Sequence, residues 1–340
     1  MLIGVIALAV VLSIAVTLTV GWRPFIGPKA RPLISRTFER TPQRLERGRY
    51  IATALSGCIY CHSSHDWAAA GTPIIPGSEG AGEVLPYNDL PGRIVAPNLT
   101  PDPETGASNW TDDQLARAIR EGIGHDGRAL FPIMPYLHYR EMSDEDLASV
   151  VVYLRSLPAV RHDLPKTEII FPVKYLIRGV PEPLTSPVGE DAGMSDPVKH
   201  GAHLVSMAGC GDCHTPQVKG ENLPGMEFAG GATFAGPWGN VATANLTPDP
   251  SGIPDYNEAL FLQVMHSGYV QARPLNPVMP VMAYTNLTDG DLKAMFAYLR
   301  TLKPVKHRVD NSEAPTECKV CRQKHGAGRD NWKRELVGGS

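Results

Sequence analysis

Cysteine is scarce in this sequence of 340 residues, which contains only six. So few thiols cannot build the dense disulfide framework that stabilises small secreted proteins. Charge is also nearly balanced, with 32 Lys and Arg against 35 Asp and Glu and a net charge of −3, so the composition shows no basic footprint for nucleic acid. No segment alternates convincingly between apolar and polar residues, which predicts few β-strands.

Four of the six cysteines stand in two motifs of the form Cys-x-x-Cys-His. These are Cys58-Ile59-Tyr60-Cys61-His62 and Cys210-Gly211-Asp212-Cys213-His214. The spacing is that of c-type haem attachment: two thiols add to the vinyl groups of one haem, and the adjacent histidine binds the iron. A single motif can be chance or a redox pair that precedes a histidine. Two motifs, each followed by a candidate sixth ligand, predict a dihaem cytochrome c with two covalently bound haem c groups.

The segments after the two motifs repeat the same features in the same order, which indicates two domains. Asn-Leu-Thr-Pro-Asp-Pro recurs at 98–103 and 245–250, Pro-x-Met-Pro at 132–135 and 277–280, and Tyr-Leu-Arg at 153–155 and 298–300. The 31 Pro and 33 Gly require long loops between helices. We expect a mostly α fold with cytochrome c domains at 42–157 and 197–305, a Pro-rich linker at 158–196 and a tail at 306–340.

Caps and periodicity place several helices. Thr111 to Gln114 reads as a capping box that opens a helix through about Glu121. Ser143 and Thr288 are expected N-caps with acidic residues in the first turn. The helix after Ser143 has an apolar stripe that must be buried, against the helix that leads into the haem motif. There Gly48, and Gly201 in the second copy, should permit close approach to Tyr153 and Tyr298.

The distal iron ligands must be chosen among several residues, whereas His62 and His214 have no rival as proximal ligands. We choose Met134 and Met279, because a thioether favours ferrous iron and the two residues occupy the same place in both repeats. The rivals fail this test. The counterpart of Met282 is Leu137, that of Met142 is Leu287, and that of His138 is Ala283.

The N-terminus is strongly apolar. Residues 2–20 carry no charge and are long enough to cross the hydrocarbon core as a helix. No basic segment precedes the run and no Ala-x-Ala site closes it, so we expect residues 1–22 to be a retained transmembrane anchor rather than a cleaved signal peptide. The eight basic residues within 23–49 would normally favour the cytoplasmic side, but large domains translocate largely regardless of flanking charge. Residues 23–41 are then a basic juxtamembrane segment. This segment lies on anionic lipid headgroups, binds a partner, or is simply exposed to solvent.

The ordered set of motifs over roughly residues 43–305 resembles the class I haem c domains of cytochrome subunits of membrane-bound bacterial dehydrogenases. The resemblance implies a mostly helical fold around each haem and His/Met ligation. It also implies haem attachment outside the cytoplasmic membrane, so we expect a protein of the bacterial cytoplasmic membrane with its haem domains in the periplasm. Two features depart from the family pattern: those subunits commonly carry three haems, and this chain adds an apolar N-terminus and an unusual tail.

The resemblance also suggests which groups surround each haem. In class I cytochromes a backbone carbonyl accepts the Nδ1 proton of the proximal histidine, and the carbonyls of Pro97 and Ala244 stand at matching positions. Asn98 and Asn245 beside them are turn formers on the simpler interpretation. Arg93 and Trp238 are candidates for contact with the haem propionates. The alternative is that Arg93 faces solvent and Trp238 packs in the protein interior.

The tail contains Cys318-Lys319-Val320-Cys321-Arg322 and then His325. Arg322 stands where a haem motif has histidine, which argues against a third haem. Cys318, Cys321 and His325 are three zinc-type ligands, one short of a closed structural site. A local disulfide between the two cysteines ranks first, and a metal site completed by another residue or subunit ranks second.

These features favour electron transfer over catalysis. The leading hypothesis is a membrane-anchored relay between a periplasmic dehydrogenase or quinol-oxidising complex and an acceptor, either another cytochrome or a terminal oxidase. A dihaem subunit of a cbb-type terminal oxidase is the alternative, although its haem domains are typically more compact. A dihaem peroxidase or thiosulfate-oxidising enzyme needs an exchangeable distal ligand, which two matched Met-Pro motifs argue against. A purely structural role would give two redox cofactors no use.

Overall fold

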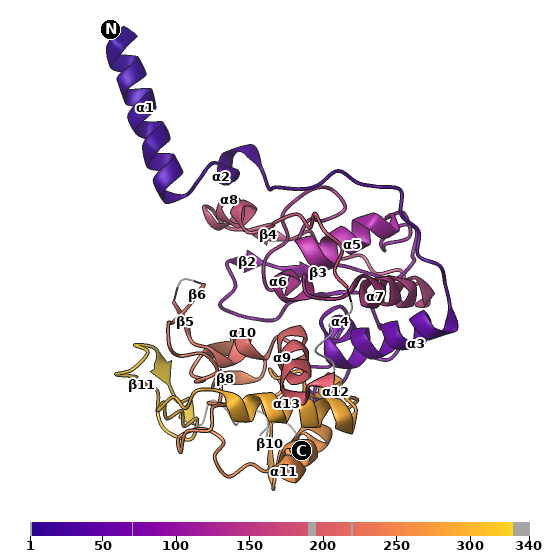
Figure 1. The fold of residues 1–340 in the computed structure, drawn as a ribbon, viewed down its shortest axis with the longest axis vertical. Coiled ribbons are helices and arrows are strands. Elements are labelled where there is room, and N and C mark those ends of the chain that lie inside the picture. Colours follow the sequence, from indigo (N-terminus) through magenta and orange to yellow (C-terminus); the bar gives the residue numbers. More distant parts are fainter. Residues whose placement is uncertain (1, 70, 190–194, 219, 329–340) are drawn as a thin grey trace.

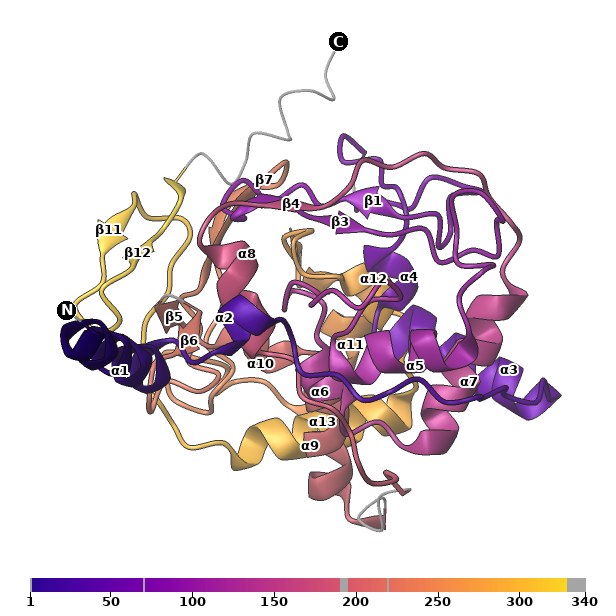
Figure 2. The same cartoon turned by 90° about the horizontal axis from the view of Figure 1, so that it is seen from above.

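The computed structural model describes residues 2–69, 71–189, 195–218 and 220–328. Residues 190–194 of the expected linker and 329–340 of the expected tail lie outside this part of the chain. The described chain forms two helical domains that lie against each other (Figures 1 and 2).

The two domains contain the same main helices in the same order. Domain 1 has α3 (Pro42–Tyr50), η1 (Ile51–Leu55), α4 (Cys58–Cys61), α5 (Asp112–Glu121), α6 (Tyr136–Tyr139) and α7 (Asp144–Ser156). Domain 2 has α9 (Pro197–Met207), α10 (Cys210–His214), α11 (Glu258–Ser267), α12 (Val281–Tyr284) and α13 (Asp289–Thr301). The expected caps are confirmed: Thr111 and Gln114 form a capping box, and the side chains of Ser143 and Thr288 accept from backbone N–H groups three residues on.

The strands are short and pair two by two. They are β1 (Glu83–Val84), β2 (Gly92–Arg93), β3 (Val95–Ala96), β4 (Glu168–Ile169), β5 (Gln217–Val218), β6 (Glu221–Asn222), β7 (Thr233–Gly236), β8 (Gly239–Ala242), β9 (Tyr269–Val270), β10 (Arg273–Pro274), β11 (Thr316–Glu317) and β12 (Lys324–His325). The pairing of β2 with β4 holds part of the segment between the domains against domain 1. That segment also contains α8 (Val173–Leu176) and η2 (Ile177–Gly179).

In each domain the helix before the haem motif packs on the last helix, as expected from the sequence. A Cβ atom on Gly48 of α3 would lie 1.8 Å from the carbonyl oxygen of Ser149 in α7. A Cβ on Gly201 of α9 would lie 1.9 Å from the carbonyl oxygen of Ala294 in α13. The same Cβ atoms would lie 2.9 and 3.0 Å from the Cβ atoms of Tyr153 and Tyr298, which confirms the predicted contact. Each helix pair buries its apolar stripe at a backbone-to-backbone crossing that only glycine permits.

One element differs between the repeats. Ten positions separate Gly48 from Cys58, but nine separate Gly201 from Cys210. Domain 1 absorbs the additional residue in the π-helical turn η1, where the N–H of Ser56 donates to the carbonyl of Ile51 at 2.8 Å. The motif helix therefore starts from an equivalent glycine in both domains, Gly57 and Gly209, each in the left-handed conformation.

The predicted membrane anchor is wrong. Within the described part of the chain, no helix is long and apolar enough to cross a membrane. The apolar N-terminal helix α1 (Leu2–Thr19) has 18 residues, which extend about 27 Å against a hydrocarbon core of roughly 30 Å. The localisation based on that anchor, with haem domains held in the periplasm by a single helix, falls with it.

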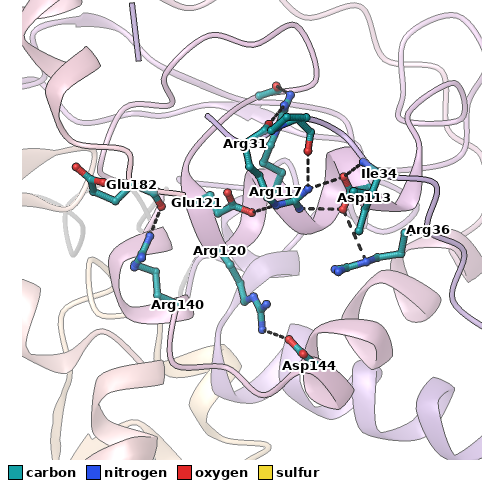
Figure 3. Close-up of polar contacts among 12 residues, drawn as sticks. Arg31, Ile34, Arg36, Asp113, Arg117, Arg120, Glu121, Arg140, Asp144 and Glu182 are labelled. Atoms are coloured by element: carbon teal, nitrogen blue, oxygen red, sulfur yellow. Dashed lines mark hydrogen bonds and ion pairs between the residues drawn. The ribbon is translucent and has the colours of Figure 1, made fainter. Parts of the chain in front are cut away.

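The basic segment after α1 and α2 (Arg23–Ile26) lies on domain 1 (Figure 3). Arg31 donates two hydrogen bonds of 2.8 Å to the carboxylate of Asp113 and one of 2.8 Å to Glu121, both on α5. Arg36 Nε lies 3.7 Å from the carboxylate of Asp113, and the N–H of Ile34 donates to the same carboxylate at 2.9 Å. Further along, Arg44 pairs with Glu145 and Arg47 pairs with Asp146. These arginines therefore neutralise carboxylates of their own chain.

Candidate haem sites

Each Cys-x-x-Cys segment forms one helical turn. Cys58 and Cys61 begin and end α4, and Cys210 and Cys213 lie in α10, so the two thiols of each motif are on the same side of their helix. Cys58, Cys210 and Cys213 are partly buried, whereas Cys61 is exposed at the surface but has much of the protein close around it. Burial raises the pKa of Cys58, Cys210 and Cys213 to about 12 and that of Cys61 to about 11. These thiols stand for the thioether sulfurs that haem attachment produces, which carry no charge and suit such an environment.

The proximal histidines have the hydrogen bonds that a haem ligand needs. His62 Nδ1 lies 2.8 Å from the carbonyl oxygen of Pro97, and His214 Nδ1 lies 2.7 Å from that of Ala244. Both expected contacts are confirmed. A carbonyl can only accept, so Nδ1 carries the proton and Nε2 keeps its lone pair for the iron. Burial lowers the pKa of both imidazoles, although the carbonyl opposes this, and keeps them in the neutral form that binds metal.

The proline-rich turns that hold Met134 and Met279 have the same hydrogen bonds in the two domains. The carbonyl of Met134 accepts from the N–H of Tyr136 at 2.8 Å, and that of Met279 accepts from Val281 at 2.7 Å. Both methionines are partly buried and pack against the core. They remain our proposed distal ligands.

The rival ligands are engaged elsewhere. His138 has partners on both nitrogens, Ser206 Oγ at 3.2 Å and Asp212 Oδ1 at 2.7 Å. The side chain of Met142 is 1% exposed in the core of domain 1, and that of Met282 is 46% exposed. Neither methionine has the half-buried position that Met134 and Met279 share.

Asn98 and Asn245 do more than form turns. Each side-chain oxygen accepts from the N–H and hydroxyl of the threonine two residues on, Thr100 or Thr247. Each Nδ2 also donates to the backbone of the segment after the last helix of the domain, to Val160 at 2.7 Å and to Val305 at 2.8 Å. These asparagines fix the loop whose carbonyl supports the proximal histidine.

The two haem motifs lie at the contact between the domains. Tyr139 donates to the carbonyl of Ser56 at 2.7 Å, and its counterpart Tyr284 donates to that of Ala208 at 2.7 Å, just before each motif. The pKa of both phenols is far above its ordinary value, chiefly because of burial and then because of nearby cysteines, which for Tyr284 include Cys61 of the other domain. Tyr87 is likewise within electrostatic reach of Cys61 and Cys213. Tyr139 and Tyr284 stand at the same position after Pro-x-Met-Pro in the two repeats, a signal that the sequence analysis did not use, whereas nothing in the repeat indicated Tyr87.

Further contacts join the domains around the motifs. The N–H of Asn88 donates to the carbonyl of Ala235 at 2.9 Å. Trp238 of domain 2 lies between two aromatic rings of domain 1, with ring centroids 5.5 Å from Trp67 and 4.9 Å from Tyr87.

The residues present fit a haem at these positions. The indole N–H of Trp238 is buried and has no hydrogen-bond partner among the described residues, so it would be available to a polar group of a bound haem, such as a propionate. Arg93, the other propionate candidate, instead pairs with Glu168 at 3.0 Å. Domain 2 thus has the two thiols and the neutral imidazole with a free Nε2 that covalent haem requires, and an unpaired buried donor besides. Domain 1 has the same set apart from the indole.

The tail cysteines are both free thiols in the structure. Cys318, Cys321 and His325 come together with a fourth residue, His307, which the sequence analysis missed. The repeat contained its signal: Val-Arg-His at 160–162 matches Val-Lys-His at 305–307, beyond the segments that were compared.

Comparison with known proteins identifies the class. The cytochrome c family matches residues 45–158 and 198–303, so the chain belongs to the cytochrome c family. It therefore carries two covalently bound haem c groups and is an electron-transfer protein rather than a catalyst.

The relatives include subunits of dehydrogenases. One subunit of the nicotinate dehydrogenase of Pseudomonas putida is 31% identical over 314 residues, 86% of this chain and 24% of that protein. The cytochrome c subunit of the quinone-dependent alcohol dehydrogenase of Gluconobacter oxydans is 31% identical over 276 residues, 77% of this chain and 55% of that subunit. A diheme cytochrome c-type protein of Cereibacter sphaeroides is 28% identical over 275 residues, 76% of this chain and 86% of that protein. The chain thus spans only about a quarter of the length of the nicotinate dehydrogenase subunit and about half of the length of the alcohol dehydrogenase subunit.

Proposed function

We propose that this cytochrome accepts electrons from a dehydrogenase and passes them, from one haem to the other, to a further cytochrome or a terminal oxidase. The observation that carries the proposal is the position of the two haem motifs at one contact between the domains, within electrostatic reach of each other. The names of the nicotinate and alcohol dehydrogenase relatives support a dehydrogenase as the donor.

In this proposal His62 and Met134 bind one iron, and His214 and Met279 bind the other. Each haem supplies a site for one electron when bound. The protein holds the imidazoles with Pro97 and Ala244, which fixes ring orientation and raises ligand basicity. The two distal turns have the same backbone contacts, so Met134 and Met279 would be held alike, and a haem with a methionine as sixth ligand could exchange electrons without rebuilding its coordination.

A direct test uses the full haem-loaded chain with candidate dehydrogenases and their substrates, including an alcohol and nicotinate. We expect one of these pairs to reduce both haems in stopped-flow absorption, at a rate that saturates with dehydrogenase concentration. Cells that lack the chain should lose respiration on that substrate. Reduction only by small chemical reductants, with unchanged respiration in such cells, would contradict the proposed donor.

A second measurement separates a relay from an enzyme. The reduced protein should not bind carbon monoxide rapidly, because both distal positions are filled by methionine, and it should not turn over peroxide with artificial donors. Stoichiometric carbon monoxide binding at one haem with matching turnover would move the protein into the enzyme class.

A further inference from the structure

Four metal-ligating side chains converge where the tail meets domain 2. His307 follows the last helix, Cys318 and Cys321 lie in the turn between β11 and β12, and His325 ends β12. One ligand atom from each lies within 4.8 Å of the others. His307 Nε2 is 3.3 Å from Cys318 Sγ, and His325 Nε2 is 3.1 Å from Cys321 Sγ. In a tetrahedral zinc site, bonds of about 2.0 and 2.3 Å to N and S place neighbouring ligand atoms about 3.3–3.8 Å apart. The four atoms are therefore spaced closely enough to enclose one ion.

The imidazole of His307 is already oriented as a metal ligand. Its Nδ1 lies 2.9 Å from the carbonyl oxygen of Ala229, so Nδ1 carries the proton and Nε2 faces the sulfur with a free lone pair. The counterpart in domain 1, His162, has the same support, with Nδ1 3.0 Å from the carbonyl oxygen of Ala81. His162 has no cysteine beside it among the described contacts. The repeat therefore uses this histidine as a structural residue, and domain 2 adds the cysteines around it.

The cysteine turn also has the features of a metal-binding loop. The backbone N–H of Val320 points at Cys318 Sγ, 3.3 Å away, where it would stabilise a thiolate. The N–H of Cys318 donates to the carbonyl of Gln323 at 2.7 Å and closes the loop. Cys321 is 2% exposed and His325 is 6% exposed, so these ligands are shielded from solvent.

Gly231 makes room for the cluster. It has a positive φ of 91°, and a Cβ there would lie 2.6 Å from His307 Cε1 and 2.7 Å from His325 Nε2. The loop that contains Gly231 also reaches the second haem site, because the N–H of the preceding residue, Gly230, donates to the carbonyl of His214 at 2.7 Å. An ion at the cluster would thus tie the tail to the loop that contacts the proximal histidine of domain 2.

We propose that His307, Cys318, Cys321 and His325 bind one Zn²⁺ as a closed, structural site. Two sulfur and two imidazole ligands in a tetrahedral arrangement suit zinc, and four protein ligands leave no open position for a substrate. Binding displaces one proton from each thiol, so two protons are released per ion and no redox change occurs. A disulfide between Cys318 and Cys321 would use both sulfurs that face the Nε2 atoms of His307 and His325 and give those nitrogens no ion to share, and for that reason we place the metal site ahead of it.

The test uses the full haem-loaded protein. Elemental analysis should find one zinc for every two iron, and X-ray absorption at the zinc edge should show two sulfur ligands at about 2.3 Å and two nitrogen ligands at about 2.0 Å. Cys318→Ser with Cys321→Ser should lose the zinc while both haems stay attached. His307→Gln should lower zinc occupancy at least tenfold at limiting metal.

His162→Gln is the matched control, because it removes the equivalent histidine of domain 1 and should keep one zinc per chain. The wild-type measurement decides even if a variant fails to fold. A wild-type protein without zinc and with a mass lower by the two hydrogens of a Cys318–Cys321 disulfide would overturn the proposal. So would free thiols without metal after incubation with Zn²⁺, or a third iron in place of zinc.

Discussion

Replacing Arg31 by alanine should destabilise domain 1 strongly, although this residue lies outside the helices. The carboxylate of Asp113 is fully buried and the Arg31 side chain is 18% exposed. Burial alone would raise the pKa of Asp113, but the hydrogen bonds from Arg31 and from the N–H of Ile34, together with nearby positive charges, outweigh it and hold that pKa below its usual value. Arg31→Ala leaves this buried negative charge with much weaker compensation.

The magnitude follows from the burial of the pair. Breaking a buried ion pair by removing one partner costs about 3–5 kcal/mol of unfolding free energy. We expect about 3 kcal/mol, the lower end, because Ile34 and Arg36 still face Asp113. For domain 1, with about 110 residues, the midpoint of thermal unfolding should fall by about 12 °C. Far-UV circular dichroism with urea and heat measures both quantities.

The control is Lys29→Ala, which breaks an exposed pair with Glu182 whose side chains are 50% and 53% exposed, and it should change little. The pH dependence has a definite sign. Because the pKa of Asp113 is lowered in the folded state, its stabilisation is present above the pKa of the unfolded chain, about 4, and is lost as pH falls through the folded value. The difference between wild type and Arg31→Ala should therefore shrink toward pH 3. Equal effects of Arg31→Ala and Lys29→Ala at neutral pH would refute the reasoning.

Two more substitutions test the haem ligands and the helix crossing. Met134→His should lower the midpoint potential of one haem by a sizeable part of the roughly 0.8 V over which axial ligands tune haem iron, and Met279→His should do the same for the other haem. Redox titration measures both midpoints, and unchanged values would remove the methionine from the ligand set. Gly201→Ala should cost about 3 kcal/mol of unfolding free energy, because its Cβ would lie 1.9 Å from a backbone oxygen of α13. Gly290→Ala, whose Cβ meets nothing closer than 3.9 Å, is the control and should be neutral or stabilise by up to about 1 kcal/mol. Similar urea midpoints for both glycine variants would show that the backbone can move apart at the crossing.

Features that depend on neighbouring residues, or that occur in both repeats, could be predicted from the sequence. The capping box at Thr111, the N-caps Ser143 and Thr288, and the glycine crossings at Gly48 and Gly201 depend on short spacings. The carbonyl partners of His62 and His214 were implied by the resemblance to class I cytochromes, and the repeated Asn-Leu-Thr gave their positions in both domains.

What could not be predicted depends on contacts between distant segments. Arg31 and Asp113 are 82 residues apart, so a pattern of basic residues gave no sign that the segment lies on α5. His307 became a candidate only when the fold brought it to Cys318. The expected anchor was inferred from the absence of charge in residues 2–20, which does not define where the helix ends, and α1 stops at Thr19.

The contact between the two haem motifs has a consequence for stoichiometry. If the donor is a dehydrogenase, as proposed, each substrate oxidation releases two electrons, whereas one haem stores one. With two haems on one chain, the cytochrome has capacity for both electrons of a single turnover before it meets its acceptor. Because Cys61 and Cys213 lie close together at the contact between the domains, the second electron would enter beside a centre that is already reduced. The two midpoints should therefore depend on each other and differ even between sites with identical ligands.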